Sequence, residues 1–142
     1  MSDIKETKER LHEVQVDRFQ KLDPKNKPSL LDVVNGRYEA GQVWRDACTL
    51  HHFYDKGADG KLKRIMAKIG QTELPPYNRK KWDREYLRDA AQGSPEWKEY
   101  LLEWDEAYKL MLDAINEKTA WENALEALRT ESVNERELRK NG

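Results

Sequence analysis

The residues of this chain that could bind a metal ion lie within two helical turns. A thiol, two imidazoles and a carboxylate come from Cys48, His51, His52 and Asp55. Two pairs among them are four residues apart, which on a helix puts each pair within reach of a common ion. A four-ligand site needs further ligands, and His12 is the only other histidine. We therefore predict no metal and no cofactor, and expect a buried Cys48 beside two partly exposed histidines.

The motifs that could carry catalysis are incomplete. Residues 55–60 begin like a calcium loop, but the third position is Gly57 and the twelfth is Met66, so the bidentate acid is missing. Residues 57–61 are too short for a phosphate loop, and Leu62 stands where such loops carry a hydroxyl. Neither a Ser–His–Asp nor a Cys–His arrangement with an orienting acid is recognisable. We predict that the protein is not an enzyme.

A basic segment with interleaved aromatic residues offers a different chemistry. Between Lys61 and Trp82, seven cations face one acid, Glu73, which is a local net charge of +6. Single-stranded nucleic acid needs Lys and Arg for its phosphates and ring faces for its unstacked bases. The candidate nucleic-acid contacts are Lys61, Lys63, Arg64, Lys68, Arg79, Lys80, Lys81, Trp82, Arg84 and Arg88.

Two other interpretations of this segment stay open. Trp82 and Tyr86 are four residues apart and fit the core of a helical protein, with the lysines as a solvated face. The segment from Ser94 to Glu122 holds eight acids against three lysines, a local net charge of −5, so basic and acidic blocks could also pair between subunits.

One long helix is the strongest structural signal in the sequence, and it must position the aromatic residues that it carries. Ser94 can cap its N-terminus, Pro95 suits the first helical position, and Glu96 suits the positive end of the helix dipole. A heptad seam then runs through Tyr100, Trp104, Ala107, Met111, Ala114, Lys118, Trp121, Leu125 and Leu128. No Pro or Gly interrupts the helix before Gly142.

This seam predicts helix association. A narrow stripe of period 3.5 is typical of a coiled coil, and a lone polar residue such as Lys118 can specify register or partner number. The predicted interface with a second copy or a partner protein consists of Trp97, Trp104, Tyr108, Met111, Lys118, Trp121, Leu125 and Leu128. The alternative is that the whole stripe packs inside the monomer.

The remaining elements also read as helices, so the predicted fold is all-α, a helical hairpin or bundle with one long coiled-coil-like helix. We expect a charged helix or arm over 1–22, a linker over 23–28, and a helical core over 29–130 with its long helix from residue 95. Within the core, a helix over 29–56 should end at Gly57 and Gly60, and short helices should cover 61–69 and 79–92. Asn35-Gly36 could break the first turns of the 29–56 helix. Residues 131–142 should fray as a charged tail.

The composition fits elongated helices and sets the compartment. The 142 residues are 37% hydrophobic and 37% charged, with a mean hydropathy of −1.06 and a net charge of −1. A single cysteine excludes an internal disulfide, and no apolar run approaches the roughly 18 residues of a membrane span. We predict a soluble cytoplasmic protein that contacts no membrane.

The layout resembles UvsY-type phage recombination mediators. The residues that carry the likeness are Tyr38-Glu39-Ala40, the basic stretch from Lys61 to Lys81 and the end of the long helix from Leu125 to Asn134. The Pro75-Pro76 loop and the Trp-rich helix depart from it. The resemblance implies an oligomeric, helical protein that loads a recombinase onto single-stranded DNA in a phage-infected host. It implies DNA contacts at Lys61, Lys63, Arg64, Lys68, Lys80 and Lys81.

The leading hypothesis is therefore a homo-oligomer that binds single-stranded nucleic acid through residues 61–88. A second hypothesis is a protein-binding adaptor or inhibitor, such as a phage factor that masks a host protein through Trp97, Trp104 and Tyr108. The third is a structural assembly protein. An exposed Trp-rich patch would favour the second hypothesis, a basic groove would favour the first, and a closed ring with neither would favour the third.

Overall fold

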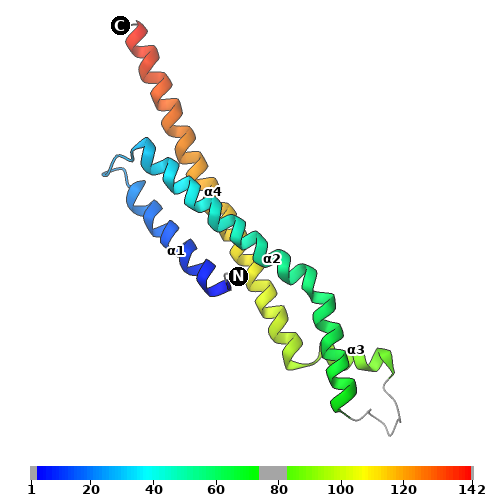
Figure 1. The fold of residues 1–142 in the computed structure, drawn as a ribbon. Helices are drawn as coiled ribbons and strands as arrows, with labels where there is room; N and C mark the ends of the chain where they lie inside the picture. Colours follow the sequence, from blue (N-terminus) through cyan, green and yellow to red (C-terminus); the bar gives the residue numbers. More distant parts are fainter. Residues whose placement is uncertain (1–2, 74–82, 142) are drawn as a thin grey trace. The chain divides into compact units, whose positions relative to one another are not determined.

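The computed structural model describes residues 3–73 and 83–141, and over these ranges the chain is all-α. Four helices follow one another: α1 (Ile4–Lys21), α2 (Leu30–Thr72), α3 (Arg84–Gln92) and α4 (Pro95–Asn141) (Figure 1). The predicted all-α fold with a long C-terminal helix is confirmed. The Pro75-Pro76 loop and the predicted start of a helix at Arg79 lie outside the described residues.

Local capping explains where three of these helices begin. Asp3 accepts a hydrogen bond from the Glu6 N–H at the start of α1. The Ser29 hydroxyl accepts from the Asp32 N–H at 3.1 Å, and the Ser94 hydroxyl accepts from the Trp97 N–H at 3.3 Å. Each cap pairs one of the N–H groups that a helix N-terminus leaves without an intrahelical partner.

The predicted break at Gly57 and Gly60 is wrong, because α2 runs unbroken from Leu30 to Thr72. A glycine ends a helix by adopting a left-handed conformation, and no glycine among the described residues has a positive φ. Glycine inside a helix costs about 1 kcal/mol relative to alanine, which packing of the flanking apolar residues can outweigh. Gly36 likewise leaves the helix intact.

At the C-terminus, α4 continues to Asn141, whereas the sequence predicted a frayed tail from residue 131. All described residues beyond Leu128 are exposed. Within the described part of the chain, its own hydrogen bonds and its continuity with the packed part of α4 therefore stabilise the helix there.

The helices build two compact units. The terminal unit contains residues 3–50 and 109–141, and the central unit contains the described residues of 51–108. In the terminal unit α1, the first part of α2 and the second part of α4 lie side by side (Figure 1). Its buried apolar side chains are Leu11, Val14, Val33, Ala40, Val43, Ala47, Leu50, Leu110, Ala114, Trp121 and Leu125.

Trp121 is the largest fully buried side chain of the terminal unit, with 0% exposed surface. Its ring lies against Gly36 of α2, where a β-carbon would overlap three ring carbons. Gly36 therefore permits a close approach of α2 and α4. Trp121 Nε1 and Thr7 Oγ1 are buried and form no hydrogen bond with any described residue, so shape rather than polar pairing positions this part of the core.

The buried polar residue of the α4 seam is Glu117, whereas the sequence suggested Lys118. Glu117 is 3% exposed, and one of its oxygens accepts a hydrogen bond from Arg18 Nε on α1 at 2.6 Å. Lys118 is half-buried, and its ammonium lies 4.4 Å from the centre of the Trp44 ring on α2. Both residues thus hold α4 to helices of the same chain.

The central unit packs the second part of α2 against α3 and the start of α4. Its core consists of Leu62, Ile65, Ile69 and Ala91, with Met66, Leu87, Ala90 and Trp97 packed against it. An aromatic cluster continues from this core. The Trp97 ring stacks on the Tyr100 ring with 5.5 Å between their centres, and the centres of the Tyr100 and Tyr54 rings are 5.3 Å apart. The Tyr100 hydroxyl donates to the Tyr54 carbonyl at 2.7 Å.

Tyr54 makes the central unit sensitive to alkali. Burial, followed by the charge and hydrogen bond of Glu103, raises the pKa of Tyr54 from 10.0 to about 12. The folded state keeps this proton when the unfolded state has lost it, so stability is present below pH 10 and is lost as the pH rises towards 12. We expect the free energy of unfolding of Tyr54→Phe to fall less than that of the wild type between pH 9.5 and 11.5. Urea titrations followed by tryptophan fluorescence measure both values. Equal losses would show that other groups carry the alkaline transition.

Candidate nucleic-acid interface

The predicted cations of the central unit lie on two packed helices. Lys61, Lys63, Arg64 and Lys68 come from α2, and Arg84 and Arg88 come from α3. All are exposed except Lys61, which is half-buried. The shared core of α2 and α3 thus brings cations from distant parts of the sequence into one unit. Arg79, Lys80, Lys81 and Trp82 lie outside the described residues.

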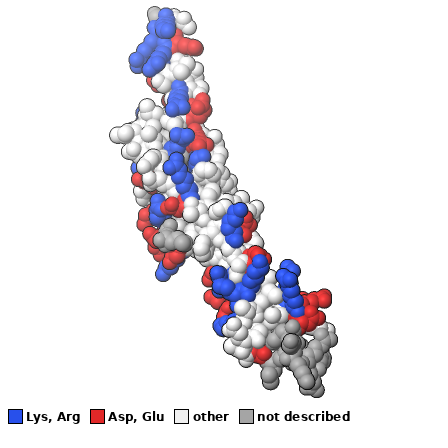
Figure 2. Space-filling model, turned by 45° about the vertical axis from the view of Figure 1, so that its right-hand side comes forward, with Lys and Arg blue, Asp and Glu red and all other residues white. Residues whose placement is uncertain are grey.

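Part of this positive charge is neutralised within the chain. Lys68 Nζ lies 2.7 Å from Glu96 Oε1, and Lys63 Nζ lies 3.0 Å from Asp59 Oδ2. The hydrogen bond and charge of Glu96 raise the pKa of Lys68, and those of Lys68 lower the pKa of Glu96. On the face drawn in Figure 2, Lys and Arg atoms of this unit alternate with Asp and Glu atoms. A phosphate backbone would therefore compete with acids of the same chain.

A second group of cations lies around Gly41 in the terminal unit, where it forms a groove with aromatic rings. This Gly41 groove has a volume of about 300 Å³ and is lined by Arg37, Tyr38, Gly41, Gln42, Trp44, Arg45 and Lys118. A β-carbon on Gly41 would meet no atom within 4 Å, so the glycine leaves open space between the flanking side chains. Such a volume is at the small end of ligand-binding clefts.

The side chains of the Gly41 groove combine ring faces with positive charge. Tyr38 is 67% exposed, and its hydroxyl accepts a hydrogen bond from Gln42 Nε2 at 2.9 Å. Trp44 is half-buried and carries the Lys118 ammonium over its ring. These contacts hold both rings in place while leaving part of each accessible.

Glu122 is the acid that the structure pairs with the groove cations. It lies 3.4 Å from Lys118 Nζ and 3.7 Å from Arg37 Nη2, whereas Arg45 is exposed and has no ion pair among the described residues. Three cations against one acid leave the groove positive. Anionic ligands with a flat ring suit this combination.

The Gly41 groove was not predicted from the sequence, although the sequence holds one signal for it. Arg37-Tyr38 and Trp44-Arg45 each place a cation beside an aromatic residue, and Arg37 and Trp44 are seven residues apart. Two helical turns separate such residues, so they share a face. The third cation, Lys118, comes from α4, and only tertiary packing brings it to the same place.

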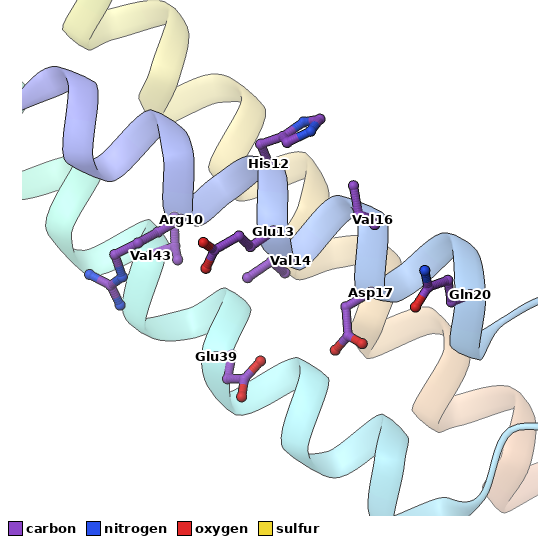
Figure 3. A pocket seen from close by; sticks show the side chains of 9 residues that line it. All are labelled: Arg10, His12, Glu13, Val14, Val16, Asp17, Gln20, Glu39 and Val43. Carbon is purple, nitrogen blue, oxygen red and sulfur yellow. The ribbon is translucent and has the colours of Figure 1, made fainter.

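Another hollow of the terminal unit lies between α1 and α2 and has the opposite charge. Its volume is about 680 Å³, and its lining includes Glu13, Asp17 and Glu39. Figure 3 shows these three side chains in the space between the two helices, whereas His12 and Val16 point away from it. Carboxylates repel phosphate, so the lining of this α1–α2 hollow does not suit a nucleic-acid backbone.

The residues predicted to form a partner interface are mostly packed within their own chain. Trp121 and Leu125 are buried, and the half-buried ones are Trp97, Trp104, Met111, Lys118 and Leu128. Tyr108 is exposed, and the centre of its ring lies 5.4 Å from the centre of the His51 ring. The chain itself already covers much of the surface that this seam would offer to a partner.

The residues considered for metal binding form no such site in the described part of the chain. No group of three His, Cys, Asp or Glu residues there could hold a metal ion. Cys48 is half-buried, and burial raises the pKa of its thiol. His52 is exposed, and His51 packs against Tyr108.

None of the described helices combines the length and the apolar character that crossing a membrane requires. No protein-family model, curated protein or solved structure matches the chain.

Proposed function

We propose that this chain is a non-enzymatic, oligomeric helical protein that binds single-stranded nucleic acid. The observation that carries the proposal is the Gly41 groove, in which Arg37, Arg45 and Lys118 surround the accessible rings of Tyr38 and Trp44.

Each side chain of the groove has a role in this proposal. The cations neutralise phosphates and release condensed counterions, which makes binding strong at low salt and weak at high salt. Tyr38 and Trp44 stack on unpaired bases, which any sequence can provide because every base has a ring face. The open space at Gly41 accommodates a base or sugar between the two rings.

The basic residues predicted over 61–88 act as a further contact in this proposal. Arg64, Arg84 and Arg88 are exposed and have no ion pair among the described residues, so they remain available to phosphate. A role as a recombination mediator, which the resemblance to UvsY-type proteins implies, stays a prediction.

Filling the groove should abolish binding without unfolding the protein. Gly41→Leu places a side chain in the open space, and leucine is the better helix former by about 0.8 kcal/mol, so the variant should be at least as stable as the wild type. We expect its affinity for a fluorescent oligothymidylate at 50 mM salt to fall by about tenfold or more, the range expected from losing one to two stacked bases. Anisotropy titrations measure the affinity, and thermal melts measure the stability.

Gly60→Leu is the matched control, because Gly60 also lies in α2 with open space around it but is remote in sequence from the groove. It should keep wild-type affinity. The proposal also predicts that Arg45→Glu weakens binding and that affinity falls steeply with added salt. Absent or salt-independent binding by the wild type would contradict the nucleic-acid function itself.

A protein-binding adaptor is the second candidate, and exposed apolar residues of the central unit favour it. Leu102 is 71% exposed on α4, and Leu101 and Tyr108 are also exposed. Of the three anchors predicted from sequence, Trp97 and Trp104 pack in the aromatic cluster, which leaves Tyr108 as the accessible one. A wild-type protein that ignores oligonucleotide at low salt would make this the better function.

A further inference from the structure

The C-terminal segment 129–141 of α4 is a helix that packs against no other helix of the described ranges 3–73 and 83–141. All of its residues are exposed, including Val133 at 51%, and Figure 1 shows no other helix beside this end of α4. Isolated helices of fewer than about 12–15 residues are marginal in water, so a helix of this kind gains stability when another surface covers it. The segment is therefore an unpartnered helix end.

Most of the positive charge of this segment lies on one face of the helix. Arg129, Val133, Arg136 and Lys140 follow one another at spacings of four, three and four, which places them on one side of the helix. Glu131 and Glu135 lie on the other side, and Glu137 borders the basic face. Figure 2 shows blue atoms gathered on one side of the C-terminal end, with red atoms beside them. One face of the segment is thus basic around a single aliphatic side chain.

The α1–α2 hollow has the complementary chemistry. Its deep side is formed by Val14 and Val43, both buried, and its walls carry Glu13, Asp17 and Glu39 (Figure 3). Acidic walls around an aliphatic base match a basic helix face around Val133.

The acids of the hollow keep an excess of negative charge after internal pairing. Asp17 binds Lys21 at 3.0 Å, and Arg10 of the lining pairs with Asp46. Glu13 and Glu39 form no ion pair among the described residues. The hydrogen bond to Asp17, with the charges of Asp17, Asp32 and Glu39, raises the pKa of Lys21, as a negative environment would.

We propose that the C-terminal segment 129–141 of one copy docks in the α1–α2 hollow of a second copy, and that the two copies exchange these segments reciprocally. A segment cannot reach the hollow of its own chain, because α4 is continuous to Asn141 and has no turn that would fold it back. Reciprocal exchange makes the contact self-complementary, as in two-fold symmetric dimers. This inference rests on the oligomeric part of the proposed function and not on its nucleic-acid contact.

Charge-reversed variants test the docking directly. The tail variant carries Arg136→Glu and Lys140→Glu, and the hollow variant carries Glu13→Lys and Glu39→Lys. Light scattering behind size exclusion at 50 mM salt, without nucleic acid, should give a dimer for the wild type and a monomer for each variant alone. An equimolar mixture of the tail variant and the hollow variant should again give a dimer. The acidic tail of the tail variant fits the basic hollow of the hollow variant, and the unchanged basic tail of the hollow variant fits the unchanged acidic hollow of the tail variant.

Two controls match the charge changes. Lys25→Glu with Lys27→Glu changes the net charge as the tail variant does, and Glu131→Lys with Glu135→Lys changes it as the hollow variant does, on the other face of the segment. Both should remain dimeric. A monomeric wild type, or a mixture that stays monomeric, overturns the inference.

The outcome separates this inference from the nucleic-acid function. The hollow variant retains every residue that lines the Gly41 groove. It should therefore still bind oligothymidylate as a monomer. Loss of dimerisation with retained binding supports both proposals. A wild-type dimer that ignores oligonucleotide removes the nucleic-acid function and leaves the docking intact.

Discussion

Replacing Gly36 by alanine is expected to destabilise the protein by about 1–3 kcal/mol, although alanine is the better helix former. The added β-carbon would overlap the Trp121 ring, which is fully buried. Overpacking of this kind displaces both the side chain and the backbone of the facing helix. The measurement is urea unfolding of the wild type and Gly36→Ala, followed by tryptophan fluorescence.

Gly41→Ala is the matched control, since Gly41 lies in the same helix with nothing within 4 Å of its added β-carbon. It should raise stability by about 0.5–1 kcal/mol. A double-mutant cycle localises the effect, because Gly36→Ala should cost much less when Trp121 is already leucine. Equal costs in the two backgrounds would mean that Gly36 and Trp121 do not limit each other's packing.

Replacing Arg18 by methionine should cost about 3–5 kcal/mol, the penalty typical of leaving a buried charge without its partner. Arg18 Nε donates to Glu117 at 2.6 Å, and the Glu117 side chain is almost completely removed from water. Methionine preserves much of the aliphatic contact of Arg18 but cannot donate a hydrogen bond. Thermal melts and urea titrations at neutral pH measure the loss.

The partner variants decide whether charge or packing is responsible. Glu117→Gln keeps an acceptor for Arg18 and should cost less than Arg18→Met. Arg18→Met combined with Glu117→Leu removes both polar groups and should recover much of the loss, because apolar pairs of similar volume often replace buried ion pairs without penalty. If the double variant is as unstable as Arg18→Met alone, the cost lies in lost packing of Arg18.

Helix starts could be predicted from sequence because they depend on a few adjacent residues. Ser29 and Ser94 both cap the helices that follow them, as their spacing to Asp32 and Trp97 requires. The apolar face of α4 could also be predicted, since a helical stripe is visible in the sequence. The phase of that stripe could not, because Glu117 and Lys118 are adjacent and either fits a seam with a period near 3.5.

Glycine is the residue type whose role the sequence left undetermined. Gly36, Gly57 and Gly60 all resemble helix breakers, yet α2 passes through each of them. A glycine ends a helix only where the chain turns away, and the packing of neighbouring helices decides whether it does. Gly36 faces Trp121, which lies 85 positions further along the chain. A β-carbon built on Gly57 would lie 3.1 Å from the Tyr100 hydroxyl oxygen.

The sequence by itself determined the all-α class, the capped helix starts and the lack of a complete catalytic motif, because these follow from local spacing and residue type. Tertiary structure alone decided which cations have acidic neighbours, which aromatic rings stay accessible and where Lys118 meets Trp44. Those properties depend on pairs of residues from different helices. Their distances are set by how the buried faces pack, which no local pattern specifies.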